Sequence, residues 1–281
     1  MASLKETESS HWYTPNGDAA HQWEGKPTTL RTAKKLKREK GLSLYPSVTN
    51  ILGILAKPAL TRWMVGQGMN ATMLMLSEQG MLTKKGKELC HDIIEEGTLG
   101  NQFKQDAYDR SRELGGRASD FGTRWHAMAE DINNGKEPQE DLELEPYVPL
   151  YRAWKDQNLG HIHYAEMRVV DKELGFAGTA DLVCELHDHP DEIFVLDFKT
   201  TAKEPKYLKA WPDHCYQLAA YAHAIKKHFP NKTIRTGNVM VSSITPCEPK
   251  LCLWNIAEQG NGLKIFMSAT AIWQRSKDYT P

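Results

Sequence analysis

Three apolar runs of β type, separated by short polar turns, constrain the fold of this chain more than any other feature. They cover residues 161–171, 175–186 and 192–201, and the turns between them contain glycine, aspartate and histidine. Strands joined by connections this short pair side by side in opposite directions. The sequence therefore predicts an antiparallel meander of three strands in the C-terminal half of the chain.

Two of these apolar runs each contain an aspartate, and in the second run a lysine follows the aspartate. Asp181 lies in GFAGTADLV, and Asp197 lies in IFVLDFKTT, where Lys199 follows two positions later. Side chains two residues apart on a strand share a face, so Asp197 and Lys199 are expected together. Carboxylate oxygens are ligands that Mg²⁺ prefers. The pattern predicts a divalent-metal site suited to phosphodiester cleavage; the alternative is two strand-end caps and a solvated lysine.

Two neighbouring segments add polar groups to this cluster. Glu166 lies in the first predicted strand, and carboxylates gathered on adjoining strands repel one another unless a cation neutralises them. A helix predicted over 212–229 carries Gln217 and Tyr221, which are four residues apart and share one face. Strands over 237–244 and 250–257 and an amphipathic helix over 262–275 are expected to complete the core.

The first half of the chain is expected to be polar at its start and helical afterwards. Residues 1–43 are predicted to form a polar basic arm, and 44–135 a helical region, before a core over 136–281. Ser47 or Thr49 is expected to cap a helix over 48–55, because their hydroxyls accept backbone N–H groups. Pro58 should end that helix, and a second helix should begin near residue 60. Helix is also expected over 83–134, with breaks at Gly97, Gly100 and Gly115-Gly116.

Residues 31–40 form a charge block, with six basic side chains against Glu39. One interpretation is a solvated helix or a flexible arm; the other is an arm that contacts phosphates. The residues expected to contact nucleic acid are Lys34, Lys35, Lys37, Arg38, Ser47, Thr49 and Arg124. The aromatic residues that could stack on unpaired bases, or pack in the core instead, are Trp12, Tyr13, Trp23, Tyr45 and Trp63.

Composition excludes several classes of protein. The net charge is −1, so a nucleic-acid site must be a local patch rather than a global positive field. The N-terminus has no signal-peptide pattern, and no apolar run approaches the length of about 18 residues that a membrane span needs. We expect a soluble cytoplasmic protein, located in the host cytoplasm if it is phage-encoded. The five scattered cysteines predict reduced thiols, with an iron–sulfur cluster near Cys247 and Cys252 as the alternative.

Taken in order, five short motifs resemble the PD-(D/E)XK nucleases of the RecB type. The motifs are Gly122-x-x-x-His126, Glu166, Gly178-Thr-Ala-Asp181, Asp197-Phe-Lys199 and Gln217-x-x-x-Tyr221. The RecB/Cas4-like branch, with the mitochondrial genome maintenance exonuclease and phage exonucleases, is the most similar. The resemblance covers about residues 45–225, including PSVTNIL at 46–52. Because a flanking set of four cysteines is missing, the members without a cluster match better.

The resemblance implies an α/β (α+β) fold: a restriction-endonuclease-like core with a central mixed β-sheet flanked by helices, plus an N-terminal helical region. It also implies Mg²⁺ or Mn²⁺ as cofactor. The implied metal ligands are His126, Glu166, Asp181, Asp197 and the backbone carbonyl of Phe198. Glu166 is a ligand of a second metal or a partner of a ligand; the alternative is a plain strand carboxylate. The implied catalytic residues are Asp181, Asp197, Lys199, Gln217 and Tyr221.

In this interpretation Lys199 orients or deprotonates the attacking water, or stabilises phosphate charge, and Gln217 and Tyr221 position Lys199 or the phosphate. The expected activity is a divalent-metal-dependent DNA exonuclease, acting on single-stranded ends in DNA repair or recombination. A recombination or replication protein is a candidate partner. The alternatives are an endonuclease of the same fold, or a non-catalytic nucleic-acid-binding or assembly subunit.

Overall fold

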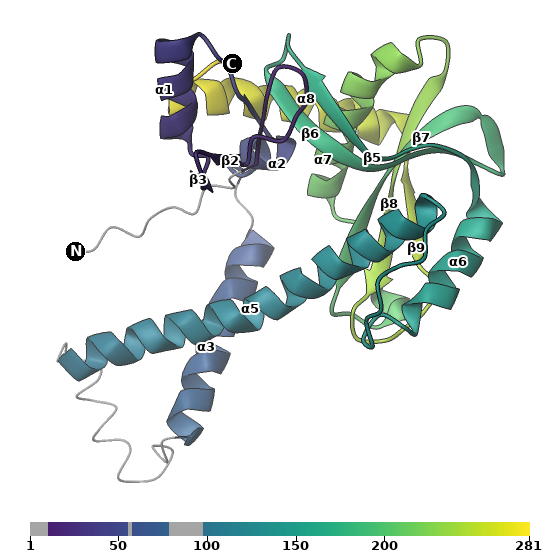
Figure 1. Ribbon diagram of the computed structural model, residues 1–281. Coiled ribbons are helices and arrows are strands. Elements are labelled where there is room, and N and C mark those ends of the chain that lie inside the picture. Colours follow the sequence, from purple (N-terminus) through teal and green to yellow (C-terminus); the bar gives the residue numbers. More distant parts are fainter. Residues whose placement is uncertain (1–10, 56–57, 79–97) are drawn as a thin grey trace. The chain divides into compact units, whose positions relative to one another are not determined.

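The computed structural model describes residues 11–55, 58–78 and 98–281, which form two compact units (Figure 1). The first unit comprises Met1–Leu55 and Trp125–Pro281, and the second comprises Ala56–Arg124. This division follows packing, whereas the three segments expected from the sequence were assigned from composition and predicted elements and stay a prediction. No helix in the described parts of the chain is long and apolar enough to cross a membrane.

The first unit is built on a sheet of five strands in the order β5-β6-β7-β8-β9. The strands are β5 (Leu159–Asp171), β6 (Phe176–Leu186), β7 (His189–Thr201), β8 (Thr233–Ser242) and β9 (Lys250–Trp254). Strands β5, β6 and β7 pair antiparallel, as the predicted meander requires. Strand β8 runs parallel to β7, and β9 runs antiparallel to β8. The expected mixed sheet flanked by helices is therefore confirmed.

Helices cover the sheet and bury its apolar residues (Figure 1). The connection from β7 to β8 contains a 3-10 turn η1 (Pro205–Tyr207), helix α7 (Pro212–Ile225) and a second 3-10 turn η2 (Lys226–His228). Helix α8 (Ile256–Lys277) packs against α7, and both contribute to the main hydrophobic core. Phe198 of β7 lies against Trp125 and Tyr151 instead, with ring centroids 5.1 and 5.9 Å away. Tyr151 belongs to helix α6 (Tyr147–Asn158).

The N-terminal segment is part of this core rather than a charge block apart from it. Its elements are β1 (Trp12–Tyr13), β2 (Gln22–Trp23), β3 (Lys26–Pro27), α1 (Leu30–Lys40), β4 (Tyr45–Pro46) and α2 (Val48–Leu52). Trp12 is 1% exposed and packs against the rings of Trp273 and Tyr279. The basic run is a helix whose Ala33 and Leu36 are buried. The polar arm expected from the sequence is therefore corrected to a packed helix. Ala33 and Leu36, three positions apart, suffice to pack one face of this charged helix against the core.

The second unit contains helix α3 (Pro58–Glu78) and most of helix α5 (Thr98–Asn133). A bidentate pair joins these helices, with Arg110 donating to both oxygens of Glu78 at 2.7 and 2.6 Å. The breaks expected at Gly100 and at Gly115-Gly116 were wrong, because α5 continues through them. A glycine costs a helix about 1 kcal/mol relative to alanine but keeps its N–H group. Gly97, the other expected break, lies outside the described residues.

Candidate active site

The two aspartates lie where strands β6 and β7 stop pairing. The last paired residues are Leu182 and Leu196, and Asp181 and Asp197 are the next residue on each strand toward the open end. The backbone N–H of Phe198 donates to Asp181 Oδ2 at 2.7 Å instead of to a strand carbonyl. The carboxylate of Asp181 therefore accepts a backbone hydrogen bond just past the last β6–β7 pair. Both aspartates lie together at this end of the paired strands, as expected.

Asp197 is the most enclosed of these acids, with 2% of its surface exposed. The ammonium group of Lys199 lies 2.8 Å from Asp197 Oδ1 and 2.6 Å from Oδ2. The side-chain amide of Gln217 donates to Oδ1 at 3.0 Å. A buried carboxylate is costly unless it is paired and hydrogen-bonded, and these donors meet that requirement. The expected grouping of Asp197, Lys199 and Gln217 is present.

Asn238 is a site residue that the sequence reasoning missed. The parallel register of β7 and β8 places Asn238 beside Asp197, and its amide donates to Asp197 Oδ2 at 2.9 Å. The indole N–H of Trp254 donates to Asn238 Oδ1 at 2.8 Å and so fixes the orientation of the amide. Asn238 is fully buried. An asparagine inside the apolar run of β8 was the signal that could have found it, because buried amides need partners.

Helix α7 supplies Gln217 and Tyr221 from one face, as their spacing predicts. The amide of Gln217 lies 3.4 Å from the hydroxyl of Tyr221. The ring of Tyr221 lies directly on Gly178 of β6, where a Cβ atom would be only 2.5 Å from Tyr221 Cε1. This contact explains the glycine in the Gly178-Thr-Ala-Asp181 motif. Burial and the charge of Asp197 raise the pKa of Tyr221, so its phenol stays protonated.

His126 reaches the site from the C-terminal part of α5. Its Nε2 lies 3.1 Å from the carbonyl oxygen of Phe198, and its Nδ1 lies 3.5 Å from Asp181 Oδ2. A carbonyl only accepts, so the Nε2–H group donates to Phe198 and orients the ring. The other nitrogen then faces Asp181. This arrangement, with one nitrogen tied to the backbone, is typical of histidines that bind metals.

Glu166 of β5 lies in a left-handed backbone conformation, with φ of +55°. It falls between the pairs Ala165–Leu182 and Met167–Ala180, at the level of Asp181. Such a conformation costs a residue with a side chain on the order of 1 kcal/mol or more, and strain of this kind gathers at functional sites. The strained backbone of the edge strand therefore coincides with the acidic cluster.

The acids of this cluster disfavour each other's ionisation. Burial, together with the charges of Asp181, Glu130 and Asp197, raises the pKa of Glu166 to about 8. Burial and the charge of Asp197 raise the pKa of Asp181 to about 6, although His126 opposes the change. Carboxylates held close without enough positive charge behave in this way. A cation placed among them would remove the repulsion.

The residues present fit a divalent cation. One ligand atom each from His126, Glu166 and Asp181 lie within 4.8 Å of one another. An imidazole nitrogen and two carboxylate oxygens suit Mn²⁺, and the oxygens suit Mg²⁺. Asp197 was expected as a further ligand, but its oxygens already accept from Lys199, Gln217 and Asn238. The ligand set predicted from the sequence thus remains a prediction, with three of its members gathered at one point.

The basic residues expected to contact nucleic acid have protein partners. Lys34 lies 3.5 Å from Asp278, Lys37 donates to the carbonyl of Thr280, and both contacts join α1 to the C-terminal end of the chain. Lys35 and Arg38 lie 3.9 and 2.9 Å from Glu39. Arg124 lies 3.0 Å from Asp120. These exposed pairs are weak, so the side chains remain available to a polyanion and their role stays a prediction.

Ser47 has a structural task that the sequence also suggested. Its hydroxyl accepts the N–H of Asn50 at 3.1 Å and so caps α2, while the Thr49 hydroxyl lies 3.0 Å from it. Ser47 is 3% exposed. The expected helix over 48–55 is shorter, because it ends at Leu52. Contact of Ser47 or Thr49 with DNA remains a prediction.

Most of the N-terminal aromatic rings pack in the core. Trp12, Tyr13 and Tyr45 are buried, which leaves them no free face for a nucleobase and favours the alternative of core packing. Trp23 is partly exposed, with the ammonium of Lys40 5.7 Å from its ring centroid. The side chain of Trp63 lies outside the described residues. These three buried rings therefore provide no surface for base stacking.

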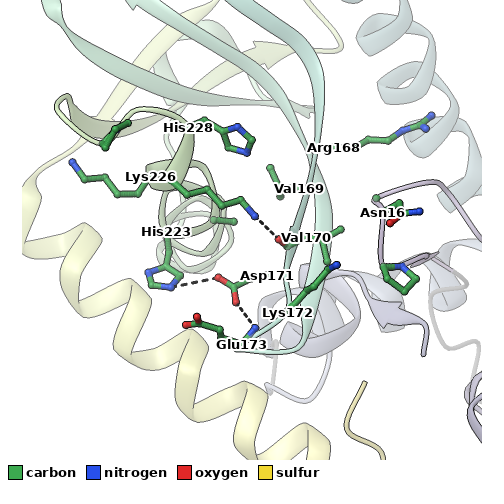
Figure 2. Close-up of a pocket in the computed structure, with 15 residues that line it drawn as sticks. Asn16, Arg168, Val169, Val170, Asp171, Lys172, Glu173, His223, Lys226 and His228 are labelled. Atoms are coloured by element: carbon green, nitrogen blue, oxygen red, sulfur yellow. Dashed lines mark hydrogen bonds and ion pairs between the residues drawn. The ribbon is translucent and has the colours of Figure 1, made fainter. Parts of the chain in front are cut away.

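Two cavities flank the edge strand β5. One, of about 690 Å³, is lined by Glu166, Glu130 and Arg168 and so opens beside the acidic cluster. The other, of about 790 Å³, lies at the turn from β5 to β6 (Figure 2). There Lys227 donates to the carbonyl of Val170 at 2.9 Å. His223 lies 3.5 Å from Asp171 (Figure 2). Lys227 and His223 contact the turn there, whereas the cavity lined by Glu166 borders the acidic cluster.

None of the four cysteines in the described part of the chain belongs to this cluster. Cys184, Cys215, Cys247 and Cys252 are free thiols, and the first two are buried. The fifth cysteine, Cys90, lies outside the described residues. Among the residues that the structure describes, the one group with metal-ligand spacing contains histidine and carboxylates alone.

Comparison with known proteins agrees with this geometry. Residues 143–259 match the family model of the PD-(D/E)XK nuclease superfamily, and this segment carries Glu166, Asp181, Asp197, Lys199 and the α7 pair. The fold and the matched segment agree with a restriction-endonuclease-like nuclease core, and His126, Glu166 and Asp181 form a candidate metal site within it. The match covers less than half of the chain, and it is the segment 143–259 that is similar to the PD-(D/E)XK nuclease superfamily.

A search of curated proteins finds no match to the chain. Among solved structures, the crystal structure of a "Putative exonuclease" from Eubacterium rectale is 13% identical to it. That similarity covers 60% of this chain and 73% of the other, with a TM-score of 0.40.

Proposed function

We propose that this protein is a divalent-metal-dependent DNA exonuclease that hydrolyses phosphodiester bonds at single-stranded ends, with Mg²⁺ or Mn²⁺. The observation that carries the proposal is one cluster containing Asp181, Asp197 and Lys199, with His126 and Glu166 beside it. The match of residues 143–259 to the nuclease superfamily supports hydrolysis of nucleic acid. The choice of DNA, of strand ends and of single strands is our inference.

Each polar residue has a distinct task in this scheme. His126, Glu166 and Asp181 would hold a divalent cation, which would supply Lewis acidity toward water and phosphate. Lys199 lies between the two oxygens of Asp197 and presents a fixed positive charge. Burial lowers the pKa of Lys199, but Asp197 and Asp181 outweigh it and raise the value, so the side chain is an ammonium at neutral pH. Lys199 therefore stabilises negative charge on the phosphate rather than removing a proton from water.

The residues around Lys199 keep it in place. Gln217 holds Asp197 Oδ1, and Asn238 holds Oδ2, so the carboxylate that binds the ammonium cannot rotate freely. Tyr221 remains a neutral phenol beside Gln217. Preorganisation of this kind lowers the cost of forming the charged transition state.

The test uses linear single-stranded DNA labelled at the 5′ or the 3′ end, with Mg²⁺, Mn²⁺ or EDTA. We expect stepwise loss of nucleotides with either metal and none in EDTA. Replacing Lys199 by alanine should slow cleavage by at least about 100-fold, as loss of one preorganised charge does. Lys264→Ala is the matched control, because Lys264 is exposed on α8.

A closed circular single strand separates the remaining alternatives. If the circle is cut as fast as the linear strand, the exonuclease form of the proposal is wrong and an endonuclease of the same fold is favoured. Binding without cleavage under every metal condition would indicate a non-catalytic module. Activity that requires an added partner protein would indicate an assembly subunit.

A further inference from the structure

The segment between β7 and α7 exposes two aromatic rings among lysines. Tyr207 is 60% exposed and Trp211 is 41% exposed. The ammonium groups of Lys203 and Lys209 lie 5.0 and 4.6 Å from the ring centroid of Trp211. Lys206 lies 4.8 Å from that of Tyr207. We call residues 203–211 the aromatic platform.

This combination points to an unpaired nucleic-acid strand as ligand. Single exposed apolar residues are normal on a protein surface, but two large rings interleaved with three cations in nine residues are not. Aromatic rings stack on nucleobases of any sequence, and nearby lysines attract the phosphates that connect them. The bases of a double helix are already stacked on each other, so only unpaired bases can stack on Tyr207 and Trp211.

The platform is held rigidly, although its rings are exposed. Leu208 is 2% exposed and anchors the segment in the core, and Lys250 donates to the Leu208 carbonyl at 2.9 Å. Glu204, the one acidic residue of the platform, accepts the hydroxyl of Thr245 at 3.1 Å. A surface ordered before binding loses less entropy when a ligand arrives.

Its position in the chain places the platform beside the catalytic lysine. Lys203 follows Lys199 by four residues, and Trp211 directly precedes α7, which carries Gln217. The carboxylate of Asp213, in the first turn of α7, acts electrostatically on the ammonium of Lys199. Both ends of the platform are therefore attached to elements of the active site, within one compact unit.

We propose that Tyr207 and Trp211 stack on unpaired bases of the strand whose backbone enters the active site, and that Lys203, Lys206 and Lys209 bind the phosphates of that strand. The inference rests on the proposed function for the fate of that strand. It also explains why the buried rings of Trp12, Tyr13 and Tyr45 are unnecessary for stacking.

Binding is measured by fluorescence anisotropy in EDTA, with two probes of about 20 nucleotides. One is oligothymidine, and the other is a strand of the same length without bases. Trp211→Ala should weaken oligothymidine binding by about 5-fold to 150-fold, the range known for loss of one stacked base, and leave the abasic probe unaffected. Trp211→Phe should retain most of the affinity. Ile272→Ala is the control, because Ile272 is 59% exposed on α8 and carries no ring.

Tyr207→Ala gives a second test that is independent of the start of α7. It should weaken oligothymidine binding selectively, without changing the melting temperature. Unchanged affinity for oligothymidine in both alanine variants would overturn the proposal. So would an equal loss for both probes, since stacking cannot act on a strand without bases.

The lysines are tested through salt dependence. Replacing Lys203, Lys206 and Lys209 together by glutamine should reduce the slope of log K against log salt by about 2, at about 0.7 per phosphate contact on single strands. An unchanged slope would refute their role.

Cleavage assays separate this inference from the proposed function. If the wild-type protein digests DNA with Mg²⁺ but both alanine variants bind oligothymidine normally, the proposed base-binding platform is refuted and the proposed exonuclease activity is supported. If the variants lose affinity as expected but the wild-type protein never cleaves DNA, base binding by the aromatic platform is supported and the proposed exonuclease activity is refuted.

Discussion

Replacement of Gly178 by alanine tests the packing that positions Tyr221. The added methyl carbon would lie 2.5 Å from Tyr221 Cε1 and 2.9 Å from its hydroxyl oxygen, well inside ordinary contact distance. Tyr221 is 4% exposed, so its ring has little space into which it can move. Overpacking of this kind costs about 1 to 3 kcal/mol of unfolding free energy. A displaced ring would also lose its 3.4 Å contact with Gln217, so cleavage should slow as well.

The assay is urea denaturation followed by circular dichroism, run beside a control with the same chemical change. Gly116 lies on an exposed part of α5, and a Cβ atom there would meet nothing within 4 Å. Gly116→Ala should therefore stabilise the helix, by up to about 1 kcal/mol. The same glycine-to-alanine change is thus expected to lower the unfolding free energy at position 178 and to raise it at position 116.

A double-mutant cycle identifies the clash as the cause. In a Tyr221→Ala background, the methyl group at position 178 should cost less than about 0.5 kcal/mol, because the ring that it meets is gone. The reasoning is refuted if Gly178→Ala alone is as stable as the wild-type protein. It is refuted equally if its cost persists when Tyr221 is absent.

Two further predictions concern the acids. Asn238→Leu should lower the unfolding free energy by about 3 kcal/mol and slow cleavage, because Asp197 loses a donor and the Trp254 indole is left unpaired; calorimetry showing less than about 1 kcal/mol would contradict this. The folded-state pKa of Glu166, about 8, exceeds its ordinary value of 4.5, so its contribution to stability in EDTA is complete below pH 4.5 and lost as pH rises through 8. Glu166→Gln should remove this loss, as melting temperatures between about pH 5 and about pH 9 would show; the same pH dependence in both proteins would disprove it.

The sequence alone was sufficient to predict a structural feature wherever the interacting residues are only a few positions apart in the chain. The alternation that places Asp197 and Lys199 on one face is a property of a single strand. The spacing that pairs Gln217 with Tyr221 is a property of a single helix turn. The cap at Ser47 also depends only on residues nearby. The predicted meander succeeded for the same reason, because its turns are too short for any other pairing.

The tertiary structure decided what depends on partners remote in the chain. Asn238 lies beside Asp197 because β7 and β8 pair in parallel across the α7 crossover, a register that neither strand specifies alone. Gly178 meets Tyr221 only once the helix covers β6. Trp12 is buried because the far end of the chain supplies Trp273. Local hydrogen bonds depend on neighbours in sequence, whereas burial and strand register depend on which surfaces meet, and this difference separates what the sequence determined from what the fold decided.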